Sequence, residues 1–240
     1  MPLSFSLTPA PTATTLRRAG AALLDLLFPP RCVICQRGGA LLCSSCVAEF
    51  VPAVGKRCPH CWQPGRPPCL RCQVRSPAFA SLCTAFVYSG ALRDAILAVK
   101  YRGYYAAAGR LIDLVDLEGI ARGCEVVVPV PMPGRRRRTR GFNQAQVIAA
   151  RLAERLDLPC NPHALRRLRV SPQQSRQPDL EARRANVEGA FAADPARVRG
   201  RHVLVVDDIA TSGATLDACA NALLAAGAAS VHAWAIAHED

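Results

Sequence analysis

Two adjacent carboxylates, Asp207 and Asp208, follow a short apolar run and precede a turn of small and hydroxyl residues that enters a helical pattern, in the stretch HVLVVDDIATSGATLDAC. Backbone N–H groups of such a turn, together with the N-terminus of the helix, can hold an anion. The acids would repel a bare phosphate, but carboxylates accept hydrogen bonds from ribose hydroxyls. A 5-phosphorylated sugar suits both the turn and the acids. Its phosphate can lie in the turn, and its 2- and 3-hydroxyls can donate hydrogen bonds to the acids.

The residues expected to hold the phosphate are the five that form the turn: Thr211, Ser212, Gly213, Ala214 and Thr215. A mononucleotide loop of the Gly-x4-Gly-Lys-Ser/Thr type is excluded, because the turn contains no lysine. The alternative is a polar strand-to-helix turn with an ordinary N-cap. An N-cap needs only one polar residue, so the additional hydroxyls and acids favour ligand binding.

The segment VLVVDDIATSGAT resembles the ribose-5-phosphate (PRPP) binding motif of type I phosphoribosyltransferases, in which a hydrophobic strand leads to two acids and a Thr/Ser-Gly-x-Thr loop. The likeness covers thirteen contiguous residues. It departs from the pattern at Ser212, where Thr is common, and at Ala210, where a larger residue often stands. Neither departure removes a hydrogen-bond donor.

A basic segment follows the apolar run VVVPVP. It holds Arg135 to Arg138 and Arg140, and then GFNQ enters a helical pattern. Arginine runs are usually solvated surface, but a position after a strand suits pyrophosphate, which needs concentrated positive charge. PVP…RGFNQ is similar to the signature of the ComF family, which includes ComFC and its GntX-like relatives. KYRGYY, with Lys100 and Arg102, resembles another block of that family, without an assigned role.

A third segment, SPQQSRQPDLEARRANVEGAF, resembles the ComF pattern at Gln174, Leu180, Arg183, Asn186, Gly189 and Phe191. In type I phosphoribosyltransferases the corresponding loop closes over the reaction centre, which excludes water from the activated sugar. The alternative is a surface turn with helix-forming arginines.

The family resemblance implies a protein that binds PRPP with Mg2+, the ion lying mainly on the ligand's own oxygens. It assigns the reaction centre to Asp207, Asp208 and Arg183. Besides the turn, it implies ligand contacts at Val130, Pro131, Arg140, Gly141, Asn143, Gln144 and Gln174. No segment resembles a base-recognising hood, so the sequence names no acceptor for the ribose.

Eight cysteines near the N-terminus form an internal repeat, two copies of C-x2-C-x7-C-x2-C offset by 26 residues. They are Cys32, Cys35, Cys43, Cys46, Cys58, Cys61, Cys69 and Cys72. Each C-x2-C turn directs two thiolates at one tetrahedral ion, and two such turns close a structural zinc site. The sequence therefore predicts one or two structural zinc ions. Pairing within each copy needs the shorter loops, although pairing between copies stays open.

Two alternatives to zinc exist for this repeat. A disulfide framework does not suit a chain expected in the cytoplasm, where thiols stay reduced. An iron–sulfur cluster would need a redox role that nothing else in the chain suggests. His60 lies inside the third cysteine pair, but that copy already has four thiols, so His60 is not expected to be a ligand.

The elements that must position these residues alternate between strand and helix from residue 80 onward. Apolar strand patterns cover 81–88, 124–131, 163–170, 202–208 and 230–237, and helical patterns cover 91–102, 104–116, 143–156 and 213–227. Such alternation predicts βαβ crossovers and a mostly parallel sheet, with ligands beyond the carboxyl ends of its strands. The expected fold class is α/β, a type I phosphoribosyltransferase-like sheet flanked by helices and preceded by a small Cys-rich zinc-ribbon domain.

The expected organisation is an N-terminal helix or tail over 1–30, a double zinc ribbon over 31–75 and a phosphoribosyltransferase-like domain over 80–240. The net charge is +12, and all but two of the 30 Lys and Arg residues are arginines, which suits anionic partners. No stretch approaches the roughly 20 apolar residues of a membrane span. A cytoplasmic location is therefore expected.

Three functional hypotheses follow from the residues and the resemblance. The first is a PRPP-binding phosphoribosyltransferase connected with competence and DNA uptake. The second is a non-catalytic zinc protein that handles single-stranded DNA together with other DNA-uptake proteins, although aromatic residues for base stacking make up only 5% of the chain. The third keeps PRPP binding without catalysis and describes a metabolite-sensing regulator.

Overall fold

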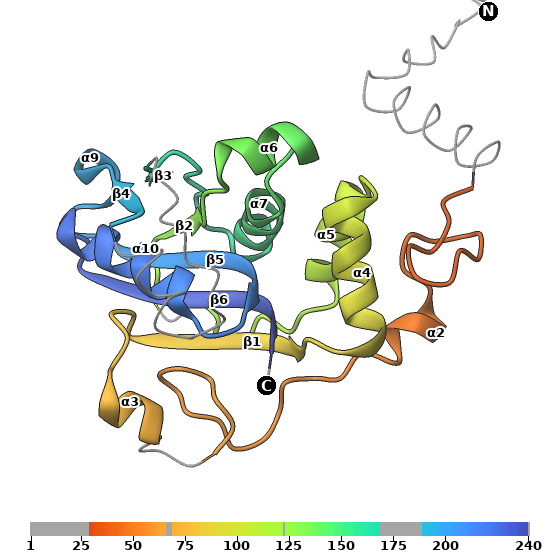
Figure 1. Ribbon diagram of the computed structural model, residues 1–240, viewed down its shortest axis with the longest axis horizontal. Coiled ribbons are helices and arrows are strands. Elements are labelled where there is room, and N and C mark those ends of the chain that lie inside the picture. Colours follow the sequence, from red (N-terminus) through yellow and green to blue (C-terminus); the bar gives the residue numbers. More distant parts are fainter. Residues whose placement is uncertain (1–28, 66–68, 122, 169–188, 240) are drawn as a thin grey trace, which may run out of the picture.

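The computed structural model describes residues 29–65, 69–121, 123–168 and 189–239. A four-stranded, wholly parallel sheet in the order β1-β6-β5-β2 forms its centre (Figure 1). These strands are β1 (Ser81–Val87), β2 (Val126–Pro129), β5 (His202–Ala210) and β6 (Ser230–His238). Two short strands, β3 (Leu165–Arg167) and β4 (Phe191–Ala193), pair antiparallel in a second sheet.

Eight helices accompany the strands within the described residues. They are α2 (Ser44–Val47), α3 (Leu70–Val74), α4 (Gly90–Tyr101), α5 (Tyr105–Asp113), α6 (Gly134–Arg140), α7 (Gln144–Leu156), α9 (Pro195–Val198) and α10 (Ala214–Ala225). None of these helices has both the length and the apolar character needed to cross a bilayer.

Strand β5 shows why the sheet is covered on both faces. Its apolar residues alternate, so that Val203 and Val205 face one core while Leu204 and Val206 face the other. Helices α4, α5 and α7 pack on the Leu204 side. Helix α10 and the β3–β4 pair pack on the Val203 side. The predicted fold class, a parallel sheet flanked by helices, is confirmed.

Near the proposed site, two sequence-based expectations differ from the structure. The strand predicted to end at Asp208 continues to Ala210, because β5 keeps pairing with β6 as far as Ala210 and His238. The acids therefore lie within the strand. The arginine segment predicted as a loop forms helix α6, since arginine has a high helix propensity. The tail 1–28, and Gln174, Leu180, Arg183 and Asn186, lie outside the described residues.

The two cysteine copies attach at different places on the sheet domain. The first module, residues 32–46, contains α2, which packs beside α4 (Figure 1). The spacer that follows runs antiparallel along the free edge of β1, where the Ala53 N–H donates to the Ala85 carbonyl at 2.9 Å. The second module, residues 58–72, therefore lies near the start of β1, on the side of the sheet that α10 covers.

Candidate functional site

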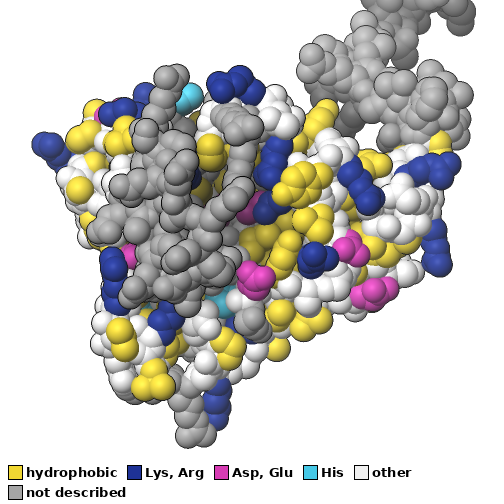
Figure 2. Space-filling view, in the orientation of Figure 1, with side chains coloured by type: hydrophobic (Ala, Val, Ile, Leu, Met, Phe, Trp, Pro, Cys, Tyr) yellow, Lys and Arg dark blue, Asp and Glu magenta, His cyan; other side chains and the backbone are white. Residues whose placement is uncertain are grey.

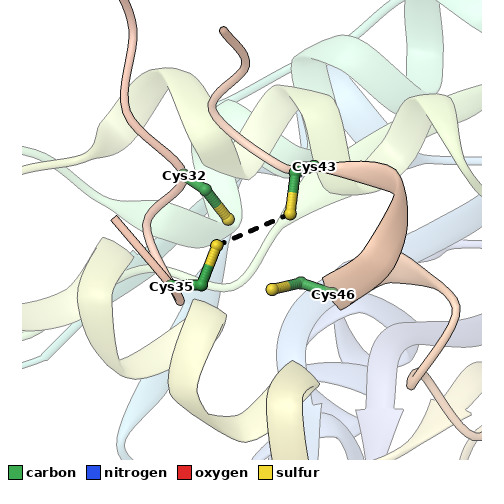
Figure 3. Close-up of side chains that lie close together, drawn as sticks. All are labelled: Cys32, Cys35, Cys43 and Cys46. Atoms are coloured by element: carbon green, nitrogen blue, oxygen red, sulfur yellow. Dashed lines mark hydrogen bonds between the residues drawn. The ribbon is translucent and has the colours of Figure 1, made fainter. Parts of the chain in front are cut away.

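The four sulfur atoms of the first module converge on one point (Figure 3). They belong to Cys32, Cys35, Cys43 and Cys46, and all lie within 4.8 Å of one another. The Sγ atoms of Cys35 and Cys43 are 3.6 Å apart. Each copy thus gathers its own four thiols, in agreement with the pairing predicted from loop length.

The second module repeats this arrangement with Cys58, Cys61, Cys69 and Cys72. Its S···S distances are 3.5 Å between Cys61 and Cys69 and 3.9 Å between Cys58 and Cys72. A tetrahedron with Zn–S bonds of about 2.3 Å has S···S edges of about 3.8 Å. The donor type and the spacing of both clusters fit a four-coordinate zinc ion.

A pocket of about 160 Å³ opens at the carboxyl ends of β2 and β5. We call it the acidic pocket, because Asp207 and Asp208 lie in its wall. The residues that line it are Lys100, Val130, Pro131, Met132, Pro133, Arg140, Asn143, Gln144, Ala145, Arg167, Asp207, Asp208 and Thr215. This is the edge at which ligands bind in parallel sheets.

The two acids of the pocket have different environments. Lys100 at the end of α4 reaches Asp208, with 2.9 Å between Nζ and Oδ2, and both side chains are largely buried. The Asp207 carboxylate accepts a hydrogen bond from the backbone N–H of Asp208 at 2.8 Å. Burial and the neighbouring charge of Asp208 nevertheless raise the pKa of Asp207 to about 8. Asp207 therefore holds its proton more strongly than an ordinary carboxyl group does.

The opposite wall of the pocket is fixed by Asn143. Its Nδ2 donates to the Val130 carbonyl at 3.0 Å, and its Oδ1 accepts from the Ala145 N–H at 3.2 Å, capping α7. The next residue, Gln144, is 2% exposed, and its Nε2 has no acceptor among the described residues. A buried amide without a partner is costly. Gln144 thus lines the pocket with an amide donor that stays unsatisfied among the described residues.

The 211–215 turn joins β5 to α10. Gly213 has a φ of 69°, in the left-handed region, and lies at the N-cap of the helix. Within the described residues, the backbone N–H groups of Ser212, Gly213 and Thr215 have no acceptor. The turn therefore presents several free donors at the start of a twelve-residue helix, which is the arrangement that favours an anion.

The turn residues do not all line one cavity. Thr215 lines the acidic pocket, whereas Ser212, Gly213 and Ala214 line a smaller depression beside the second module. Thr211 and Gly141 line neither. Of the other residues implied by the resemblance, the acidic pocket gathers Val130, Pro131, Arg140, Asn143, Gln144, Asp207 and Asp208.

Sequence reasoning did not assign two cations of the pocket. Lys100 was noted in KYRGYY without a role, and Arg167 lies in β3, whose pattern reads only as a strand. Their partners are distant in sequence, so no local spacing could have identified them. Both line the acidic pocket, and Lys100 contacts Asp208.

An aromatic and cationic surface adjoins the pocket at α6. The Arg140 guanidinium lies over the Tyr101 ring, 4.8 Å from its centroid, and the rings of Tyr105 and Phe142 meet edge to face at 5.8 Å. Tyr101 is 69% exposed and Tyr105 is 61% exposed. Figure 2 shows hydrophobic side chains gathered over α4 and α5 with Lys and Arg side chains beside them.

Comparison with known proteins identifies related sequences. Residues 139–239 match the family model described as a phosphoribosyl transferase domain. The chain is 30% identical to DNA utilization protein YhgH of Escherichia coli K12 over 225 residues, which is 88% of this chain and 98% of that protein. It is 29% identical to competence protein ComFC of Bacillus subtilis over 214 residues, 81% of this chain and 83% of that protein.

Solved structures also include similar chains. One, of the allosteric regulatory enzyme of purine biosynthesis, has 25% identity and a TM-score of 0.35, and the likeness covers 54% of this chain and 25% of that one.

Proposed function

The chain belongs to the ComF family of proteins with a phosphoribosyltransferase domain, and we propose that its acidic pocket and 211–215 turn bind PRPP or ribose 5-phosphate, with Mg2+ on the ligand. The observation that carries this proposal is the meeting of two kinds of group at the end of β5. Asp207 and Asp208 offer acceptors, and the turn directly after them offers free backbone donors. A phosphorylated ribose needs both.

The two ends of the ligand meet different parts of the site. Donors of the 211–215 turn hold the 5-phosphate, while the acids accept hydrogen bonds from the 2- and 3-hydroxyls. Backbone groups near Val130 and Pro131, with Arg140, receive the pyrophosphate. Mg2+ bound together with the ligand would neutralise part of that charge.

Transfer of the ribose would proceed at its first carbon. The bond from that carbon to pyrophosphate breaks, and pyrophosphate leaves with the electron pair. The acceptor then forms the new bond with its own lone pair and loses a proton. The residues of this chain contribute positioning and electrostatic stabilisation of the positively charged sugar by the two acids. A protein that binds PRPP and releases no pyrophosphate with any acceptor would be a sensor instead.

The two cysteine clusters hold structural zinc in this proposal. Four thiolates leave no open position on the ion, so catalysis by the metal is not assigned. The modules contribute few apolar side chains to the core, so bound zinc would stabilise them.

Calorimetric titration of PRPP with Mg2+ tests the proposal. Wild type is expected to bind, and Asp207→Asn and Asp208→Asn are each expected to bind at least roughly tenfold more weakly, because each exchanges a carboxyl oxygen for an amide nitrogen that cannot accept from a ribose hydroxyl. Asp94→Asn is the matched control, since Asp94 is exposed on α4 and does not line the pocket. Absence of binding by the wild type, or equal binding by all variants, would refute the proposal.

A second function, contact with single-stranded DNA, is favoured by the surface around α6. Exposed Tyr101 and Tyr105 can stack on bases, and Arg140 beside them can meet a phosphate. The names of the relatives, a DNA utilization protein and a competence protein, suit a role in the uptake or use of DNA.

Fluorescence anisotropy with a labelled single strand tests this contact. The Tyr101→Ala/Tyr105→Ala double variant is expected to bind several-fold more weakly than wild type, because stacking on an aromatic ring contributes about 1–3 kcal/mol per base. Tyr88→Ala serves as the control, because Tyr88 packs against the core beneath α4 and is not on this surface. Unchanged affinity in the double variant would exclude this surface as the contact.

A further inference from the structure

The second cysteine module touches the turn that is proposed to hold the phosphate. The Arg71 guanidinium in α3 donates to the backbone carbonyl of Ser212. The Ala78 N–H donates to Asp217 in the first turn of α10, at 2.7 Å from Oδ1. Both contacts join segments about 140 residues apart in the chain. Arg71 thus joins the module to the turn, and Ala78 joins the segment after the module to the helix that the turn begins.

His60 extends this unit to the cysteine cluster itself. It lies between Cys58 and Cys61, and its Nε2 is 2.7 Å from the carbonyl oxygen of Phe79, so the ring N–H donates there. The Phe79 side chain is 1% exposed and lies under the turn, where a Cβ placed on Gly213 would be 3.8 Å from its Cζ. His60 therefore connects the cysteine turn to the residue that supports Gly213.

The Arg71 contact also fixes the direction of a donor. A trans peptide is planar, so its C=O and N–H point in opposite directions. Because the Ser212 carbonyl points to Arg71, the N–H of Gly213 in the same peptide points away from the module. That N–H has no acceptor within the described residues. The contact with Arg71 thus orients the Gly213 N–H away from the second module.

The first module lacks these groups at the matching positions of the repeat. Counting back 26 residues, Ser45 stands in place of Arg71, Ile34 in place of His60 and Ala53 in place of Phe79. Val33 and Phe50 instead belong to the core cluster beneath α4. The two copies have therefore diverged, and only the second has the residues that reach the turn.

We propose that the second module is a positioning element of the 211–215 turn, which it contacts through Arg71 and supports through the hydrogen bond from His60 to Phe79, so that affinity for a phosphorylated sugar depends on metal bound at this module and not at the first. This rests on the proposed function of the turn. The thiolates would hold zinc, and the loaded module would keep α3 and His60 in place.

Thermodynamic linkage between metal binding and ligand binding predicts a second effect, which can be measured without catalysis. If metal at the second module strengthens ligand binding, then the ligand must strengthen metal retention at that module by the same factor. Ribose 5-phosphate should therefore raise the concentration of a chromogenic chelator that removes one of the two zinc ions at equilibrium. The chelator concentration that removes the other ion should stay unchanged.

The test uses full-length protein and ribose 5-phosphate as the probe. Calorimetry is expected to show roughly tenfold weaker binding for Arg71→Ala and for Cys72→Ser, because a hydrogen bond from a charged donor contributes more than a neutral one. The matched controls, Ser45→Ala and Cys46→Ser, stand at the same repeat positions of the first module and are expected to bind as wild type does. Arg71→Ala keeps all eight thiols, so it remains informative if a cysteine variant does not fold.

The outcomes separate this inference from the function on which it rests. Wild type that binds no ribose 5-phosphate would overturn both. Wild-type binding with unchanged affinity in Arg71→Ala and Cys72→Ser would overturn the positioning role alone. Equal weakening by Cys46→Ser would also overturn it, since the role belongs to one module. Ligand that protects neither zinc, or both equally, would contradict the coupling.

Discussion

Lys100 at the end of α4 and Asp208 in β5 form an ion pair of 2.9 Å at the mouth of the acidic pocket, although 108 positions separate them in the sequence. The lysine offsets one of two adjacent acids whose charges would otherwise repel each other. It is one of only two lysines in a chain rich in arginine. The pair joins the helical layer of the domain to the strand that carries the proposed ligand site.

Replacing Lys100 by Met should therefore destabilise the protein. The variant leaves Asp208 largely buried without its cation, and we expect the free energy of unfolding to fall by about 2 kcal/mol near pH 8, less than at a fully buried pair. Urea denaturation measures this change. The Asp208→Asn variant and the double variant complete the cycle, and additive effects of the two substitutions would show that the pair contributes no coupling.

The raised pKa of Asp207 predicts a pH dependence of stability. The folded state holds the proton up to about pH 8, whereas the unfolded state releases it near 3.8. The folded state binds more protons between these values, so this group's contribution to stability is present at low pH and is lost as pH rises toward 8. Thermal melts from pH 5 to 9 should show Asp207→Asn gaining stability over wild type, by roughly 10 °C between pH 5 and 8, since three pH units correspond to about 4 kcal/mol.

The informative quantity is the difference in melting temperature between Asp207→Asn and wild type, since other groups titrate in both proteins. It should grow with pH and level off above about 8. A constant difference across the range would show that Asp207 has an ordinary pKa.

Gly213 provides a test of the turn geometry. Its φ of 69° is unfavourable for a residue with a side chain, so Gly213→Ala should destabilise the protein by about 1–2 kcal/mol and weaken phosphate-sugar binding. Gly109→Ala is the matched control, because Gly109 lies within α5, has no positive φ and has open space at its Cβ. That variant should be stabilised by about 0.5–1 kcal/mol. Equal effects at the two positions would contradict the conformational argument.

Metal analysis of freshly purified protein should find about two zinc ions per chain, one for each cluster of four thiols. Cys46→Ser and Cys72→Ser should each lower the content by about one ion, because a three-thiol site binds zinc more weakly. Chelation should lower the melting temperature, since the modules depend on the metal. Iron in place of zinc, or well below one zinc per chain, would refute the assignment.

The sequence alone was sufficient for the features with a strong local signal. The apolar run before Asp207 predicted β5, the 3–4 spacing in 143–156 predicted α7, and the repeated cysteine spacing predicted the two clusters. Helix α6 was missed because five arginines in seven residues leave no apolar face to detect. The end of β5 was misplaced because pairing with β6 carries the strand past its acids.

Contacts between distant segments could not be predicted. Nothing local indicates that Lys100 meets Asp208 or that Arg71 meets Ser212, since tertiary packing creates both pairs. The same holds for Arg140 over Tyr101, which brings scarce aromatic residues to one surface. Spacing therefore indicated which residues have suitable chemistry, and the fold determined which of them act together.

Parallel calorimetric titrations of ribose 5-phosphate, ribose and inorganic phosphate test the central claim most directly. The acids and the turn together should make ribose 5-phosphate bind at least roughly tenfold more tightly than either half alone. Asp208→Asn should remove most of that advantage while leaving the affinity for inorganic phosphate unchanged or improved, because one repelling charge is lost. Inorganic phosphate binding as tightly as ribose 5-phosphate, or no binding of ribose 5-phosphate at all, would contradict the account.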